Sequence, residues 1–212
     1  MTDELIKGLS DFKRFQYSEA DGLMPRLAEE GQSPQYFIIS CIDSRSNPGT
    51  IFRARPGTFF AHKAMGAIVR PYHKGTALAA ALHFALNYNK VDTVIVLGHT
   101  QCGAVKALAE DLDDEEISSF INVAQHALEK AQKCCNTHDE ILARTEQEVV
   151  LESVENLASY PSVKKALDEN RVKLKAWVFD IQTGDLLEHN KDSNNFEIIT
   201  PNETPEDTRK TT

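Results

Sequence analysis

Residues 94–103 read VIVLGHTQCG, an apolar and mostly β-branched run followed at once by glycine, histidine and cysteine. A short apolar run without alternation predicts a central strand of a parallel sheet that is covered on both faces. Residues 36–39, YFII, have the same character and are followed by CIDSR at 41–45. Two buried strands that each end in polar residues indicate an α/β fold.

Further strands and helices extend this pattern along the chain. The segment 58–61 follows a Pro-Gly turn, and 174–179 alternates more clearly, which places it nearer an edge of the sheet. Helical patterns lie between the strands, at 76–89, 104–110, 117–133, 139–159 and in a short helix that begins at Pro161. Strands interleaved with helices predict a single domain with a mainly parallel central β-sheet flanked by helices.

The length of 212 residues favours one compact domain over two. We divide the chain into an N-terminal helical arm at 1–30, an α/β domain at 31–189 that carries the chemistry, and a polar tail at 190–212. The tail lacks periodicity, so we expect it to be mobile and dispensable for chemistry. The four cysteines are too few for a disulfide scaffold and need another explanation.

The composition excludes several classes of partner. A net charge of −9 and the lack of a basic cluster argue against nucleic acid. The longest nearly apolar stretch, 77–86, is about half of what a membrane crossing needs. The first residues resemble no secretory signal, so we expect a cytoplasmic protein in a reducing compartment.

Two segments contain residue types able to carry chemistry, and each follows a predicted strand directly: 41–45 and 99–103. In open parallel sheets ligands bind outside the carboxyl ends of the strands, so neighbouring strands would bring both segments to one crevice. Cys41, His99 and Cys102 supply two thiolates and an imidazole, which are preferred zinc ligands, and a set of three leaves a fourth position open for catalysis. Taken alone, these residues leave open the alternative that the cysteines are buried structural residues.

The combination of Cys-x-Asp-Ser-Arg at 41–45 with His-x-x-Cys-Gly at 99–103 resembles the signature of the β-class carbonic anhydrases. The similarity extends from about Gly31 to Gly103 and more loosely to 180–184. The resemblance implies a Zn²⁺ enzyme that interconverts carbon dioxide and bicarbonate, with Cys41, His99 and Cys102 as metal ligands. Zinc lowers the pKa of its bound water to about 7, and the hydroxide so formed attacks the substrate carbon.

The resemblance also implies catalytic roles beside the metal. Asp43 would accept a hydrogen bond from the zinc-bound hydroxide and orient its lone pair. Arg45 would hold Asp43 in a forked ion pair and keep the carboxylate off the metal.

Four residues are expected to bind substrate: Gln32, Phe60, Phe84 and Gly103. Phe84 stands where plant-type enzymes carry a tyrosine. In this family the pocket forms across a dimer interface, so Gln32 and the two phenylalanines would serve the partner's zinc. The resemblance therefore implies a homodimer or a dimer of dimers, with the N-terminal helix packed on the partner subunit.

Several positions depart from the family pattern. Some members hold bicarbonate in a non-catalytic pocket with a tryptophan and an arginine, where this chain has Ile38 and Lys63; the loss of both predicts the open, non-allosteric type. The usual Arg-Asn-x-Ala-Asn reads KAMGA at 63–67, and Ser46 replaces an apolar residue. Because lysine cannot reproduce a bidentate arginine contact, we expect altered support of the site.

Alternative functions are a zinc hydrolase of carbonyl sulfide or carbon disulfide, and a zinc-binding homologue that turns nothing over. A nucleotide-binding module is disfavoured because no Gly-x-Gly-x-x-Gly follows a strand. His62 and His73 could relay protons, although packing roles are favoured. The adjacent cysteines Cys134 and Cys135 are interpreted as structural.

Overall fold

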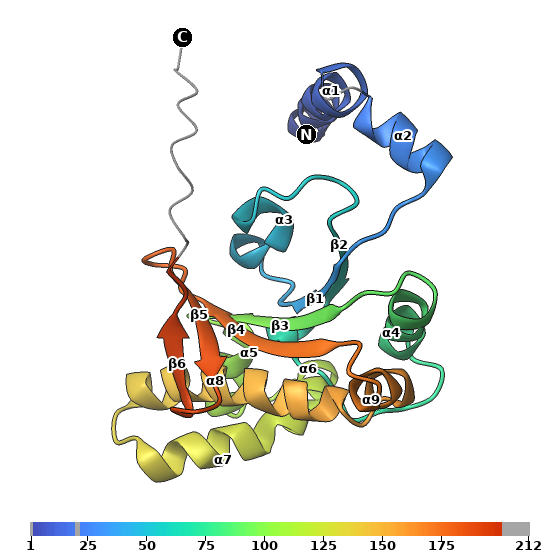
Figure 1. The fold of residues 1–212 in the computed structure, drawn as a ribbon. Helices are drawn as coiled ribbons and strands as arrows, with labels where there is room; N and C mark the ends of the chain where they lie inside the picture. Colours follow the sequence, from blue (N-terminus) through green and yellow to red (C-terminus); the bar gives the residue numbers. More distant parts are fainter. Residues whose placement is uncertain (1, 20–21, 201–212) are drawn as a thin grey trace.

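The computed structural model describes residues 2–19 and 22–200. Six strands form one sheet in the order β2-β1-β3-β4-β5-β6 (Figure 1). The strands are β1 Tyr36–Ser40, β2 Phe59–Lys63, β3 Thr93–His99, β4 Lys173–Phe179, β5 Leu186–Asn190 and β6 Asn195–Ile198. The pairs among β1 to β4 are parallel, whereas β5 and β6 are antiparallel. The α/β fold with a mainly parallel sheet is thus confirmed.

The helices occupy the segments between these strands. They are α1 Asp3–Lys13, α2 Leu23–Glu30, α3 Pro48–Ile51, α4 Ala77–Asn87, α5 Gly103–Ala109, α6 Glu115–Ile121, α7 Gln125–Cys134, α8 His138–Leu157 and α9 Pro161–Asp168. The tract predicted as one helix at 117–133 is two, because a 3-10 turn at Asn122–Ala124 separates α6 from α7. None of the described helices is long and apolar enough to cross a membrane.

The register of the parallel strands determines where the polar residues that follow them lie. Ser40, the last residue of β1, pairs with Lys63 of β2 on one side and Leu97 of β3 on the other. His99 ends β3 and pairs with Phe179, which ends β4. The four parallel strands therefore end at one edge of the sheet, where ligands bind in folds of this kind.

The central strands bury alternate side chains on opposite faces of the sheet. One face carries Phe37 and Ile39 of β1, which pack against residues of α4, α8 and α9. The other carries Ile38, which lies in a cluster with Phe52, just after α3, and Trp177 of β4. Figure 1 shows α8 and α9 on one side of the sheet and α3 on the other. Both faces are covered, as the unbroken apolar runs predict.

Gly98 lets α8 approach β3 closely. A Cβ built at this position would lie 2.4 Å from Cγ2 of Val150, closer than real Cβ atoms come. Any larger residue would push α8 away from the strand that ends in His99. Close packing of α8 on β3 therefore explains the glycine within the VIVLGH run.

The structure differs from the sequence expectations near the C-terminus. β4 is an interior strand rather than one near an edge, because β5 and β6 extend the sheet beyond it. The predicted tail at 190–212 contains β6, whose polar and largely exposed residues carry little strand signal; only Phe196 packs against the core. Residues 201–212 lie outside the described part of the chain.

Candidate metal centre

Three residues from distant parts of the sequence meet at the carboxyl edge of the sheet. Cys41 follows β1, His99 ends β3, and Cys102 precedes α5. The two sulfurs and a ring nitrogen of His99 all lie within 4.8 Å of one another. All three residues are buried, with 1–4% of their surface exposed. Among the described residues this is the one group of three or more such side chains able to hold a metal ion.

The imidazole of His99 is oriented as a metal ligand requires. Its Nδ1 lies 2.8 Å from the carbonyl oxygen of Thr100, and because a carbonyl only accepts, Nδ1 carries the proton. The other nitrogen, Nε2, is buried and has no hydrogen-bond partner. A buried nitrogen with a free lone pair beside two thiols fits zinc, and the hydrogen bond at Nδ1 fixes the ring in the way second-shell contacts do.

The two thiols influence each other strongly. The neighbouring thiol of Cys102, and then the imidazole of His99, lower the pKa of Cys41 well below its usual range in spite of its burial. The same contact with Cys41, together with burial, raises the pKa of Cys102. The protein alone thus favours one thiolate, and a divalent cation is what allows both sulfurs to be charged at once.

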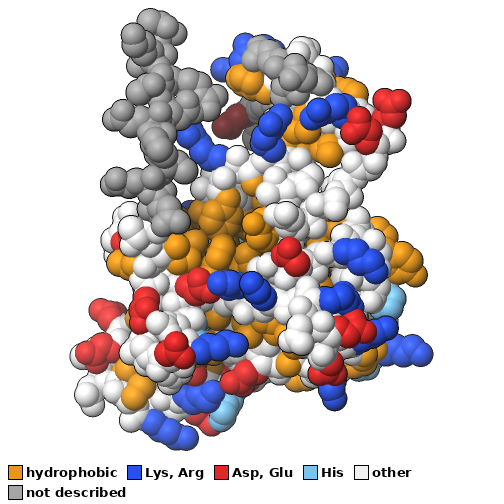
Figure 2. Space-filling model, in the orientation of Figure 1, with side chains coloured by type: hydrophobic (Ala, Val, Ile, Leu, Met, Phe, Trp, Pro, Cys, Tyr) orange, Lys and Arg blue, Asp and Glu red, His pale blue; other side chains and the backbone are white. Residues whose placement is uncertain are grey.

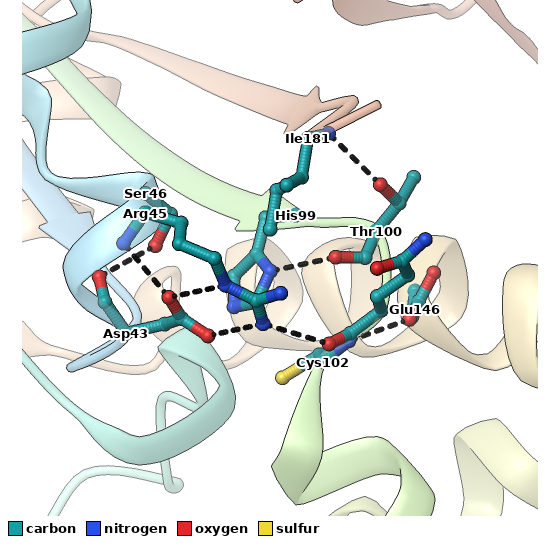
Figure 3. A network of polar contacts seen from close by, with 9 residues as sticks. Asp43, Arg45, Ser46, His99, Thr100, Cys102, Glu146 and Ile181 are labelled. Atoms are coloured by element: carbon teal, nitrogen blue, oxygen red, sulfur yellow. Dashed lines mark hydrogen bonds and ion pairs between the residues drawn. The ribbon is translucent and has the colours of Figure 1, made fainter. Parts of the chain in front are cut away.

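Asp43 and Arg45 form a forked ion pair beside these ligands (Figure 3). Nε of Arg45 donates to Oδ1 of Asp43 at 3.1 Å, and Nη2 donates to Oδ2 at 2.8 Å. The backbone amide of Arg45 also donates to Oδ1, at 2.8 Å, because Asp43 caps a 3-10 turn. The hydrogen bonds from Arg45 hold the pKa of Asp43 at about 2. Asp43 is therefore ionised, with both carboxylate oxygens engaged.

A cavity of about 450 Å³ opens beside Cys41. Its lining residues are Cys41, Ile42, Asp43, Ser44, Arg45, Met65, Gly103 and Ala104. Gly103, expected in the substrate site, does lie here, but a Cβ on it would meet no atom within 4 Å. Nothing in the described chain therefore requires a glycine at this position.

The other three expected substrate residues lie away from this cavity. Gln32 is exposed ahead of β1, and its carbonyl oxygen accepts a hydrogen bond from Asn89. Phe60 of the edge strand β2 meets Phe84 of α4 edge to face, with ring centroids 6.1 Å apart. Phe84 is 52% exposed and stacks on Tyr88. Phe60 is partly buried against the core, whereas Phe84 and Tyr88 are exposed on the surface of the single chain.

Two of the positions that depart from the family pattern, Lys63 and Ser46, contact the loop that carries Cys41 and Asp43. Nζ of Lys63 donates to the carbonyl oxygen of Cys41 at 2.8 Å, a single contact that a lysine can make. The hydroxyl of Ser46, which is fully buried, donates to the carbonyl oxygen of Asp43 at 3.2 Å. Ile38 belongs to the apolar cluster beneath α3. Lys63 and Ser46 thus provide hydrogen-bond donors to the carbonyl oxygens of Cys41 and Asp43.

One residue at the site was missed by the sequence analysis. Glu146 of α8 is 7% exposed, and its Oε1 accepts a hydrogen bond of 2.9 Å from the backbone amide of Cys102. Nothing in the helical pattern of 139–159 distinguishes Glu146 from the other acidic residues of the same helix. Only the folded structure reveals which of them faces the ligand turn.

The remaining residues considered from sequence lie elsewhere. His62 and His73 line a separate cavity of about 690 Å³, and burial lowers the pKa of His62. Cys134 and Cys135 lie at the end of α7 with their sulfurs 3.4 Å apart, and both are free thiols.

Comparisons with known proteins agree on one family. The family model described as carbonic anhydrase matches residues 36–186. A carbonic anhydrase of Pseudomonas aeruginosa is 30% identical over 186 residues, which cover 85% of this chain and 84% of the relative. A carbonic anhydrase of Synechococcus elongatus is 26% identical over 197 residues, which cover 90% of this chain and 72% of the relative. Among solved structures, the β-carbonic anhydrase CcaA superposes with a TM-score of 0.84 at 25% identity, covering 93% of this chain and 98% of that one.

Proposed function

Because the chain belongs to the β-class carbonic anhydrases, we propose that Cys41, His99 and Cys102 hold the zinc with which it interconverts carbon dioxide and bicarbonate. The observation that carries this assignment is the buried cluster of two thiols and an unpartnered imidazole nitrogen beside a cavity. Zinc held there supplies a hydroxide nucleophile at neutral pH by lowering the pKa of a coordinated water to about 7.

The residues around the ligands orient the reaction. The ionised carboxylate of Asp43 lines the cavity and can accept a hydrogen bond from the nucleophile, which turns a lone pair toward the substrate carbon. Arg45 occupies both oxygens of Asp43 and so keeps this carboxylate from becoming a fourth ligand. We therefore propose the open type of site, with a place left for substrate.

The substrate assignment is tested by stopped-flow hydration of carbon dioxide, run beside a carbonyl sulfide assay and a metal analysis of the same sample. We expect one zinc per chain and hydration of carbon dioxide. Turnover of carbonyl sulfide alone would support the alternative hydrolase. Stoichiometric zinc without turnover of either substrate would indicate a silent homologue.

We further propose that two copies of the chain assemble to complete each active site. Helix α1 has no buried residue, and it exposes Leu5, Ile6, Leu9 and Phe12 on an amphipathic face. Figure 2 shows apolar side chains gathered on the arm and on the body just below it. Phe84 of α4 and Tyr88, just after this helix, add exposed aromatic surface. Apolar surface of this extent is typical of an interface. In the dimer that we propose, Gln32, Phe60 and Phe84 of one subunit would lie near the zinc of the other.

Placing a charge on the apolar face of α1 should disrupt the assembly. We expect Leu9→Asp to shift the protein from a dimer or larger species toward monomer in size-exclusion chromatography with light scattering. Carbon dioxide hydration per chain should fall with it. Lys7→Asp, which puts a carboxylate on the opposite face of the same helix, is the control and should leave both unchanged. A wild-type protein that is a fully active monomer would refute the proposal.

A reducing compartment such as the cytoplasm suits this chemistry, because Cys41 and Cys102 must remain reduced to bind metal. We propose it as the site of action.

A further inference from the structure

Glu146 is a buried carboxylate directed at the backbone of a metal-ligand turn. Glu146 belongs to α8 and stands 44 residues after Cys102 in the sequence, and only 7% of the residue is exposed. Its Oε1 accepts the amide hydrogen of Cys102 at 2.9 Å. Figure 3 shows this carboxylate lying against the turn from the side of α8.

The turn that Glu146 holds is conformationally strained. Gln101, between the two ligands His99 and Cys102, has a positive φ of 58°, which residues with a side chain adopt at a cost. Such a conformation persists only where its surroundings fix it. Other contacts also anchor the turn: the amide of Thr100 donates to the carbonyl oxygen of Phe179 at 3.0 Å, and Arg45 donates to the carbonyl oxygen of Gln101 at 3.4 Å. At Cys102 itself, the carbonyl oxygen accepts from the amide of Lys106 at 3.0 Å, and the amide is held by Glu146.

The surroundings of Glu146 differ from those of its neighbour on the same helix. Glu148, also buried, pairs with Arg144 and Lys130, so its charge has counter-ions. Glu146 makes no ion pair within the described residues, and the one hydrogen bond located for it goes to the amide of Cys102. A buried carboxylate without a counter-ion is costly unless its hydrogen bonds are satisfied. The located hydrogen bond of Glu146 is therefore directed to the ligand turn, whereas Glu148 pairs with Arg144 of its own helix and with Lys130 of α7.

We propose that Glu146 is a positioning residue of the zinc site: by holding the amide of Cys102 in a strained turn, it fixes the sulfur of Cys102 relative to His99 and Cys41. The inference rests on the zinc site proposed above. It predicts that the carboxylate determines how tightly and in what geometry metal is held, although it touches neither metal nor substrate.

The test compares Glu146→Ala and Glu146→Gln with the wild-type holoenzyme. Zinc affinity is measured by competition with a chromogenic chelator. We expect Glu146→Ala to bind zinc about 10- to 100-fold more weakly, the range seen when residues supporting metal ligands are changed. Glu146→Gln should lie between wild type and Glu146→Ala, because its amide oxygen can still accept from Cys102 but lacks the charge that strengthens this hydrogen bond. The thiolate-to-cobalt charge-transfer band of cobalt-substituted protein should change in the same order.

Glu148→Gln is the matched control, since it removes a buried charge from the same helix without a contact to the turn. We expect it to lower the melting temperature of the metal-free protein while leaving zinc affinity and the cobalt spectrum as in wild type. Wild-type affinity and spectrum in Glu146→Ala, or an equal loss of affinity in Glu148→Gln, would overturn the role of Glu146. A wild-type protein that binds no zinc would instead refute the proposed function, so the two failures are distinguishable.

Discussion

Cys102→Ala should reduce carbon dioxide hydration to the level of the buffer blank. The side chain is one of three donors in the buried cluster, and the two that remain, Cys41 and His99, make an incomplete site for zinc. The expected result is loss of both bound zinc and activity, measured by metal analysis after dialysis and by stopped-flow hydration with a pH indicator.

Cys134→Ala provides a matched control, because this free thiol lies at the end of α7 and belongs to no metal-binding group among the described residues. It should retain full zinc and full activity. If Cys102→Ala kept wild-type turnover, the three-donor site would have to be abandoned.

Arg45→Ala should lower kcat for carbon dioxide hydration by about 100-fold while zinc content stays at one per chain, since misplacing a catalytic group by an ångström can have an effect of this size. Arg45 holds both oxygens of Asp43, and its removal leaves a carboxylate that can turn toward the metal and occupy the open position. Stopped-flow kinetics and metal analysis on the same preparation measure both quantities.

Arg45→Lys separates charge from geometry in this pair. A lysine keeps the positive charge but cannot make the two parallel contacts, so we expect an activity between those of wild type and Arg45→Ala. Full activity in Arg45→Ala would show that Asp43 needs no such restraint.

The parallel part of the sheet was predictable from sequence because its strands are buried on both faces. The runs at 36–39 and 94–97 are unbroken and apolar, and they correspond to β1 and β3. β5 and β6 carry polar, partly exposed residues, so their pairing depends on contacts with β4 rather than on a pattern of their own. The missed strands are thus those that tertiary context defines.

The candidate site was predictable to the extent that it is local in sequence. Cys41 and Asp43 on one side, and His99 and Cys102 on the other, stand directly after strands, and the shared edge of a parallel sheet brings them together. Glu146 reaches the site from a helix with no local signal, so only the packing of α8 against β3 reveals it. The substrate roles proposed for Gln32, Phe60 and Phe84 would require a second subunit, because in the single chain these residues lie away from the cavity beside Cys41.

The parallel pairing of β1 with β3 has a consequence for the order in which the protein matures. Cys41 and His99 are brought together only when strands that lie far apart in the sequence have paired, and such long-range contacts form late in folding. His99 and Cys102 stand three residues apart, but Cys41 joins them only in the folded sheet. Because such a three-donor site does not exist in the unfolded chain, we expect the finished sheet, rather than the nascent chain, to select the ion.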